Sequence, residues 1–282
     1  MTRQIILNLV PIFSILAFPW LSTDCDTDKV APNSTERDSP LVWRLVFEDE
    51  FEGKEMNDKI WEKQQSRSSP WNKYVNPDDN SLVEVKNGNL YIRAKWNKET
   101  DLPETGAIQT KDKLSFSYGK LEVKAKFSRM GQGGWPAIWM MPQNPVFKNW
   151  PDGGEIDVME HLNSDPYAYQ VIHQSESEGV EMMPAPFVTP AIDLHGYNTY
   201  GLVKTKERIE FYVNDKLTMT YTKGGVNAPR WPFETDFYLI LNYAAADKGQ
   251  SGTNFWPGLV VSPEDFPYEM AVDYVRIWEQ EE

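Results

Sequence analysis

The chain is short of cysteine and of positive charge, and each shortage excludes a class of protein. Its 282 residues include one cysteine, so no disulfide can form within the chain and packing must stabilise the fold. Lysine and arginine number 28 against 42 aspartates and glutamates, which gives a net charge of −14. Proteins that bind nucleic acid neutralise phosphates with clustered basic side chains, and no such cluster stands out. We expect a monomer with no nucleic-acid partner.

Long apolar runs are also missing, except near the N-terminus. Arg3 precedes an apolar stretch at residues 5–21 that contains Pro11 and Pro19. The stretch is short for a membrane-spanning helix and is typical of a secretory signal peptide. We predict that residues 1–24 are a signal peptide and that the protein is exported to the periplasm, the cell surface or the medium.

The single cysteine, Cys25, stands directly after this predicted signal. A lone cysteine at that place indicates a lipoprotein anchored by its mature N-terminus, although Asp24 occupies a position where a small residue is usual. Residues 25–40 are polar and rich in turn formers, which predicts a flexible linker. A lipid on Cys25 is therefore the only membrane attachment that we expect.

Helical periodicity is absent after residue 40, and short β-type segments alternate with turns. Leu121 and Val123, for example, alternate with the charged Glu122 and Lys124. Such segments lie at residues 41–47, 89–94, 120–127, 168–173, 197–204, 208–213, 237–243 and 271–278. The turn sequences KNGN at 86–89 and VNDK at 213–216 indicate hairpins. We predict one all-β domain at residues 41–282, a β-sandwich or jelly roll.

The candidate catalytic groups lie in the segment EIDVME. Strict strand alternation would place Glu155 and Asp157 on one face and bury Glu160, unpaired, on the other. A β-bulge at Val158 or Met159 resets the alternation and brings the three carboxylates to one face. Carboxylates this close push their pKa values apart, which keeps one of them protonated near neutral pH. Hydrolysis of a glycosidic bond uses such a pair, one as nucleophile and one as proton donor.

Two other interpretations of this acidic strand compete with catalysis. The carboxylates could form a solvated face, or they could bind Ca²⁺, although calcium loops carry Asp, Asn and Gly on turns rather than Glu on a strand. The neighbouring tryptophans argue against both. Trp135 and Trp139 lie upstream in GGWPAIWM, and Trp150 precedes the acidic segment closely. Indole rings stack on the C–H faces of sugars, so the surroundings favour a polysaccharide hydrolase.

The segment EIDVME resembles the E-[ILV]-D-x-x-E signature of glycoside hydrolase family 16, in the bulged form typical of laminarinases, agarases and related enzymes. Four further segments resemble family segments in the same order: FEDEF at 47–51, YGKLEVKAK at 118–126, GGWPAIWM at 133–140 and MAVDYVRI at 270–277. The resemblance therefore covers essentially all of the predicted domain. It implies a concanavalin A-like jelly-roll sandwich with a concave substrate cleft, and endo-acting hydrolysis with retention of anomeric configuration.

The same resemblance implies a role for each acidic residue of the segment. Glu155 would be the nucleophile and Glu160 the acid/base, while Asp157 would assist by a hydrogen bond to the nucleophile. Two carboxylates suffice for this chemistry, so no catalytic metal or organic cofactor is implied.

A structural Ca²⁺ on the convex side is common in the family. The matching positions in this chain are Glu50, the carbonyl group of Gly88, and Asp273. We therefore expect that a calcium ion, if present, lies among these three residues and serves stability rather than catalysis.

The region upstream of the acidic strand bears on the substrate. The family's β-1,3-glucanases usually carry a GxGNNExQxYT segment there, whereas this chain reads QQSRSSPWNKY at 64–74. That sequence is more similar to family members that act on agar, porphyran or the poly-N-acetyllactosamine of mucin O-glycans. The resemblance then implies that Arg67 and Trp71 contact the sugar on the non-reducing side of the cleaved bond. The full set of predicted sugar contacts is Arg67, Trp71, Trp135, Trp139, Trp150, His173 and Trp256.

The preferred function is thus a retaining endo-β-glycosidase acting on a galactose-containing glycan. An endo-1,3-β-glucanase is the alternative within the same reaction class, since His173 is placed like the second histidine of the laminarinase-type VHGTxH segment. A non-catalytic carbohydrate-binding protein on the same sandwich is the alternative of another class. Retention of both Glu155 and Glu160 argues against it.

Overall fold

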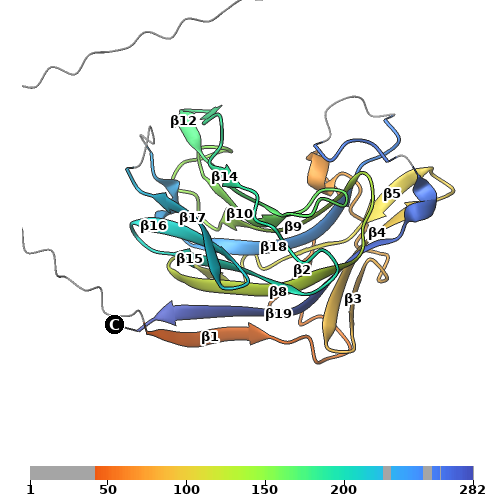
Figure 1. The fold of residues 1–282 in the computed structure, drawn as a ribbon, viewed down its shortest axis with the longest axis horizontal. Coiled ribbons are helices and arrows are strands. Elements are labelled where there is room, and N and C mark those ends of the chain that lie inside the picture. Colours follow the sequence, from red (N-terminus) through yellow and green to blue (C-terminus); the bar gives the residue numbers. More distant parts are fainter. Residues whose placement is uncertain (1–41, 225–229, 250–255, 261, 282) are drawn as a thin grey trace, which may run out of the picture. The chain divides into compact units, whose positions relative to one another are not determined.

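The computed structural model describes residues 42–224, 230–249, 256–260 and 262–281. All of these residues belong to one unit, Pro40–Glu282. The predicted signal peptide, Cys25 and the linker lie outside the described residues. Within the described ranges, no helix is long and apolar enough to cross a lipid bilayer. The chain forms two stacked antiparallel sheets, as the strand patterns predict (Figure 1).

The first sheet has nine strands in the order β17-β16-β15-β8-β19-β4-β3, with β1 beside β19 and β5 beside β4. Its strands are β1 (Trp43–Asp49), β3 (Val83–Lys86), β4 (Asn89–Asn97), β5 (Leu102–Thr105), β8 (Gly119–Arg129), β15 (Asn198–Lys204), β16 (Arg208–Val213), β17 (Lys216–Thr222) and β19 (Tyr268–Gln280). Buried and partly exposed residues alternate along β8, because one face of the strand packs on the core. The alternation seen in the sequence at Leu121 and Val123 is confirmed.

The second sheet has eight strands in the order β14-β11-β10-β9-β18-β6-β2, with β7 beside β18. Its strands are β2 (Glu62–Lys63), β6 (Ala107–Gln109), β7 (Ser115–Phe116), β9 (Gly134–Pro142), β10 (Glu155–Glu160), β11 (Tyr169–His173), β14 (Phe187–Val188) and β18 (Phe237–Ala245). The remaining elements are a ribbon of β12 (Ser175–Ser177) with β13 (Val180–Glu181), and the 3-10 helices η1 (Pro70–Asn72), η2 (Pro232–Glu234) and η3 (Pro263–Asp265).

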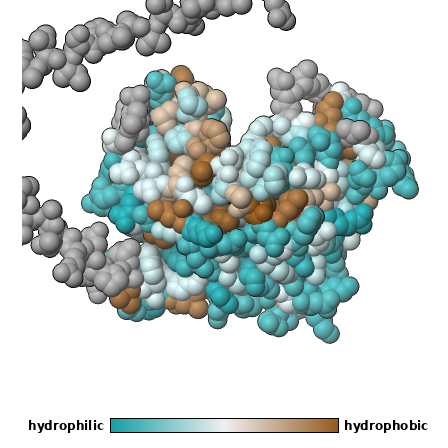
Figure 2. All heavy atoms as spheres, viewed as in Figure 1, coloured by the Kyte–Doolittle hydropathy of each residue, from teal (hydrophilic) through white to brown (hydrophobic). Residues whose placement is uncertain are grey.

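The two faces of the second sheet have different neighbours. Ile138 and Met140 of β9 join the core shared with the first sheet. Trp139, between them, belongs to a separate cluster with Tyr238 and Ile240 of β18. In the space-filling view the surface is hollowed between the ridge that carries β12 and β14 and the ridge facing it (Figure 2). The face of β9 that carries Trp139 therefore points away from the core between the sheets.

Every segment predicted as a strand forms one, most of them with shifted ends, and both predicted hairpins are present. Asn214 and Asp215 have φ angles of 50° and 62°, and Asn87 and Gly88 have 53° and 69°, as tight two-residue hairpins require. The prediction missed β9, whose apolar residues run continuously instead of alternating with polar ones. It also missed the short strands β2, β5, β6, β7, β12, β13 and β14.

Candidate active site

Strand β10 contains the β-bulge that the sequence predicts. Asp157 and Met159 pair with two adjacent residues of β9, so Val158 between them is an extra residue in the strand. Val158 and Met159 both lie in the core as a result. The extra residue resets the alternation, and Glu160 shares the open face with Glu155 and Asp157.

Each of the three carboxylates on this face has a partner of its own. Trp150 Nε1 donates to Glu155 Oε2 at 2.9 Å, Trp135 Nε1 donates to Glu160 Oε1 at 2.8 Å, and His173 Nε2 lies 3.1 Å from Asp157 Oδ2. Indole N–H groups satisfy the two glutamates without adding charge. The sequence identifies Trp135 and Trp150 as ring platforms only, and the structure shows that they also orient the two glutamates.

Burial and mutual repulsion set the protonation of the site. Burial, and then the charge of Asp157, raise the pKa of Glu155 to about 8. The same two causes raise the pKa of Glu160 well above its usual value. Burial lowers the pKa of His173, but its hydrogen bond with Asp157 and the surrounding carboxylates outweigh burial and raise it to about 10. The site therefore holds a protonated carboxyl at neutral pH, which a proton donor needs.

Glu155, Asp157 and His173 each place one ligand atom within 4.8 Å of the others, which raises the question of a metal centre. A metal ion would need a neutral imidazole nitrogen. Both ring nitrogens of His173 instead face carboxylates, because Nδ1 lies 2.5 Å from Glu181 Oε1 while Nε2 faces Asp157. The imidazolium itself supplies the positive charge that a metal ion would bring, so the group does not fit a metal.

On the Glu155 side, a groove of about 660 Å³ runs along the second sheet. It brings together Glu155 and four of the predicted sugar contacts, Arg67, Trp71, Trp139 and Trp150. The rings of Trp71 and Trp139 meet edge-on, with centroids 4.9 Å apart. Trp139 donates its N–H to Asn242 and is only 6% exposed, so its ring offers little free surface. Trp71 is the more accessible ring of the two.

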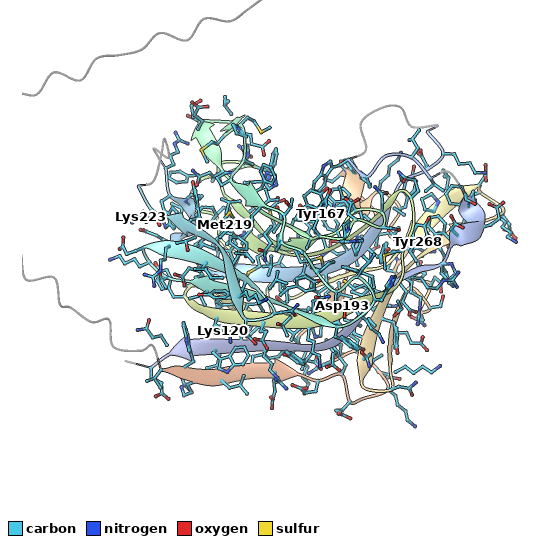
Figure 3. The ribbon with its side chains drawn as sticks, viewed as in Figure 1. Lys120, Tyr167, Asp193, Met219, Lys223 and Tyr268 are labelled. Carbon is cyan, nitrogen blue, oxygen red and sulfur yellow. The ribbon has the colours of Figure 1, made fainter. Side chains whose placement is uncertain are left out.

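On the Glu160 side, a row of aromatic rings borders the strand. Trp256 meets Trp135 edge-on at 5.7 Å and Tyr169 at 5.0 Å between centroids. Tyr167, labelled in Figure 3, continues the row 5.4 Å from Tyr169. The predicted sugar contacts include neither tyrosine, although Tyr169 takes the position of the first histidine of the laminarinase-type segment. Their spacing of two residues, at the start of a strand, is the signal that would have placed them on one face.

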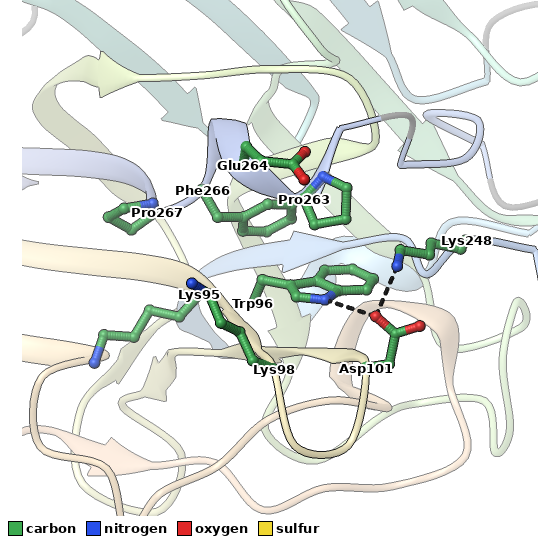
Figure 4. Close-up of a pocket in the computed structure, with 9 residues that line it drawn as sticks. All are labelled: Lys95, Trp96, Lys98, Asp101, Lys248, Pro263, Glu264, Phe266 and Pro267. Atoms are coloured by element: carbon green, nitrogen blue, oxygen red, sulfur yellow. Dashed lines mark hydrogen bonds and ion pairs between the residues drawn. The ribbon is translucent and has the colours of Figure 1, made fainter.

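A second cavity, of about 690 Å³, lies away from β10 (Figure 4). Its centre is Trp96, which packs against Phe266 with centroids 5.5 Å apart and has Lys248 Nζ 5.2 Å from its ring. Asp101 accepts hydrogen bonds from both Trp96 and Lys248. Asp101 is paired with Lys248, and the cavity lies apart from the three carboxylates of β10, so this cavity is not the candidate active site.

The residues predicted to hold calcium are engaged in other contacts. Arg276 Nε donates to Glu50 Oε1 at 2.7 Å, and Lys124 Nζ lies 2.8 Å from Asp273 Oδ2. Gly88 forms the tight turn between β3 and β4. Since cationic side chains already compensate both carboxylates, this arrangement does not fit a calcium ion. No step of the mechanism depends on one.

Comparison with known proteins agrees with this geometry. The sequence model described as glycosyl hydrolases family 16 matches residues 72–258. A keratan-sulfate endo-1,4-beta-galactosidase of Sphingobacterium multivorum is 33% identical over 245 residues, which cover 84% of this chain and 55% of that protein. A beta-glucanase of Rhodothermus marinus is 31% identical over 268 residues, which cover 87% of this chain and 88% of that protein.

One similar solved structure comes from work on endo-acting O-glycanases that members of the human gut microbiota express to initiate mucin breakdown. It superimposes with a TM-score of 0.75 at 29% identity, over 84% of this chain and 100% of that one. The chain spans about half the length of the galactosidase relative.

Proposed function

Because the chain belongs to glycosyl hydrolases family 16, we propose that it is a retaining endo-β-glycosidase. Glu155 is the nucleophile, Glu160 is the acid/base, and Asp157 between them assists. The observation that carries the proposal is the bulge in β10, which brings three carboxylates to one open face and leaves each with its own partner.

The chemistry follows from these positions. Glu160 gives its proton to the glycosidic oxygen while the carboxylate of Glu155 attacks the anomeric carbon, so the C–O bond breaks and a glycosyl ester forms. Glu160 then takes a proton from a water molecule, whose oxygen attacks the anomeric carbon and releases Glu155. The indole N–H groups of Trp150 and Trp135 hold the two carboxyl groups in place during both steps.

We further infer that the substrate is a galactose-containing chain cut at an internal β-galactosidic bond, of the agar, porphyran or poly-N-acetyllactosamine type. Two observations support this inference. Arg67 and Trp71 line the groove beside Glu155, where the segment usual in β-1,3-glucanases is missing. The galactosidase relative bears a name of this substrate class, and the similar solved structure comes from work on O-glycanases that initiate mucin breakdown. The exposed guanidinium of Arg67 also suits a bidentate contact with a sulfate group.

An endo-1,3-β-glucanase is the second candidate. The similarity to the beta-glucanase of Rhodothermus marinus favours it, since the matched residues cover 88% of that protein. A non-catalytic binding protein is disfavoured, because a lectin has no use for a protonated carboxyl beside an ionisable one.

Product mapping by mass spectrometry tests both the activity and the substrate. Wild type and Glu155→Gln are incubated with keratan, agarose, porphyran, mucin O-glycans, laminarin and mixed-linkage glucan. We expect short oligosaccharides from the galactose-containing chains with wild type only. Glucose oligomers from laminarin alone would establish the second candidate. Equal cleavage by the two proteins would refute the nucleophile, and glycan binding without cleavage by either would establish a binding protein.

A further inference from the structure

The ribbon β12–β13 reaches into the catalytic face through one side chain. Glu181, the last residue of β13, lies with its Oε1 atom 2.5 Å from His173 Nδ1. The other ring nitrogen of His173 faces Asp157 at 3.1 Å. A carboxylate, an imidazole and a second carboxylate therefore form a continuous chain from the ribbon to the catalytic strand.

We propose that Glu181 is a positioning residue for hydrolysis, which keeps His173 doubly protonated and aimed at Asp157 so that a fixed positive charge faces the nucleophile Glu155. The inference rests on the proposed function of the site. The proposal gives the ribbon β12–β13 a role in catalysis. That role follows neither from the sequence motifs nor from the positions of Glu155 and Glu160.

The first argument is the hydrogen-bonding capacity of the ring. A neutral imidazole has one N–H donor and one acceptor nitrogen, whereas the cation donates from both nitrogens. Nδ1 of His173 is hydrogen-bonded to Glu181 and Nε2 lies 3.1 Å from Asp157 Oδ2, and only a charged ring presents an N–H to both carboxylates. Removing Glu181 leaves one nitrogen without its acceptor, and the neutral ring then becomes an adequate partner for Asp157.

The second argument is the charge that surrounds the ring. Asp157, Glu155 and Glu160 act on His173 from β10, and Glu181 acts on it from β13. The ring of Trp150 lies 5.9 Å away and is neutral, and β14, which pairs with β11, carries only Phe187 and Val188. Among the described residues, Glu181 is thus the carboxylate outside the catalytic strand that acts on His173.

The third argument is the effect on the nucleophile. The charge of His173 lowers the pKa of Glu155, while burial, Asp157 and, more weakly, Glu181 raise it. If the cation is lost, the pKa of Glu155 rises further. The nucleophile must be ionised, so kcat/KM falls at the pH where the cation is lost.

Glu181→Gln is the variant that isolates this charge, because the amide oxygen can still accept from His173 Nδ1. Glu176→Gln is the matched control, since Glu176 is an exposed carboxylate on the same ribbon. The chain has three histidines, so the imidazole resonances of His161, His173 and His195 can be followed individually by NMR during a pH titration. His161, which is buried and stacked on Phe127, reports whether each variant is folded.

We expect the titration midpoint of His173 to fall by about one pH unit or more in Glu181→Gln and to stay unchanged in Glu176→Gln. We also expect kcat/KM to fall at alkaline pH, because the variant loses the His173 cation about one pH unit earlier than wild type, with little change at neutral pH. Glu181→Asp should restore part of both effects.

An unchanged midpoint for His173 in Glu181→Gln overturns the proposal whatever the activity. A loss of kcat/KM that is equal at every pH, with the His173 midpoint unmoved, assigns Glu181 to anchoring the ribbon and also overturns it. Failure of wild type to cleave any glycan refutes the proposed function instead, and the NMR titration separates that result from the coupling between Glu181 and His173.

Discussion

The two sides of the catalytic strand offer different surfaces to a sugar chain. Beside Glu155 the groove carries the exposed guanidinium of Arg67 and the accessible ring of Trp71. Beside Glu160 the row of Trp256, Tyr169 and Tyr167 offers ring faces and edges. A guanidinium can distinguish a sugar that carries a sulfate group from one that does not, whereas an aromatic ring accepts the C–H face of many sugars. We therefore predict that substrate choice is made on the Glu155 side.

The largest expected effect is a loss of kcat, and it distinguishes the roles of Glu155 and Glu160. Glu155→Gln and Glu160→Ala should each lower kcat on a polysaccharide by about a thousandfold or more, since each removes a group required for bond cleavage. Only Glu160→Ala should recover on aryl glycosides, because a good leaving group needs no proton. Rates on both substrate types are the measurement. Recovery of Glu155→Gln on the aryl glycoside would reverse the two assignments.

The pH profile gives the next largest effect. The nucleophile works in its ionised form, so activity rises as the pH passes the pKa of Glu155, which is raised to about 8. The acid limb of kcat/KM should therefore lie well above the usual range of a glutamate, with about a tenfold loss for each pH unit below it. Initial rates from about pH 4 to about pH 10 check this. An acid limb near the usual glutamate value would contradict the electrostatics of the site.

The two indole donors should differ although their geometry is alike. Trp150→Phe removes a hydrogen bond that favours the ionised nucleophile, so kcat/KM should fall about tenfold at neutral pH. Trp135→Phe removes a hydrogen bond that lowers the pKa of Glu160, and Glu160 must start protonated. Its main effect should be a shift of the alkaline limb to higher pH. Equal losses at neutral pH in both variants would contradict the assigned roles.

The smallest expected effect tests the comparison between the two sides directly. Arg67→Ala should weaken kcat/KM severalfold on sulfated galactose-containing chains and less on unsulfated ones, because Arg67 is exposed and its contacts compete with water. Tyr167→Ala should weaken all substrates to a similar extent. Competition assays with paired sulfated and desulfated oligosaccharides measure the ratio. Loss of selectivity in Tyr167→Ala but not in Arg67→Ala would place substrate choice on the other side.

Much of the fold could be predicted because strand alternation is a local property. Leu121 and Val123 alternate with charged residues whatever the rest of the chain does, and the hairpin turn at Asn214 and Asp215 depends on the backbone preferences of two residues. Among the long strands the exception is β9, which is covered on both faces, in the core and by the cluster around Trp139. A strand that is buried on both faces loses the alternating pattern.

Part of the candidate site could likewise be predicted from the sequence, and part could not. The bulge at Val158 could be predicted because the order of residues in EIDVME leaves Glu160 unpaired without it. The hydrogen bonds of Trp135 and Trp150 could not, because they join the glutamates to residues on another strand and on a loop. Nor could the sequence show that Trp139 is covered by a ring from η1.

The sequence by itself determined the all-β plan, the bulge and the set of three carboxylates, because each follows from residues that are neighbours in the chain. Only the tertiary structure decided their protonation and their partners. Glu181 meets His173 because β12 and β13 fold back beside the cleft, and His173 meets Asp157 because β11 pairs with β10. Burial and the fields of charges from several strands depend on distances in space, which spacing along the chain does not contain.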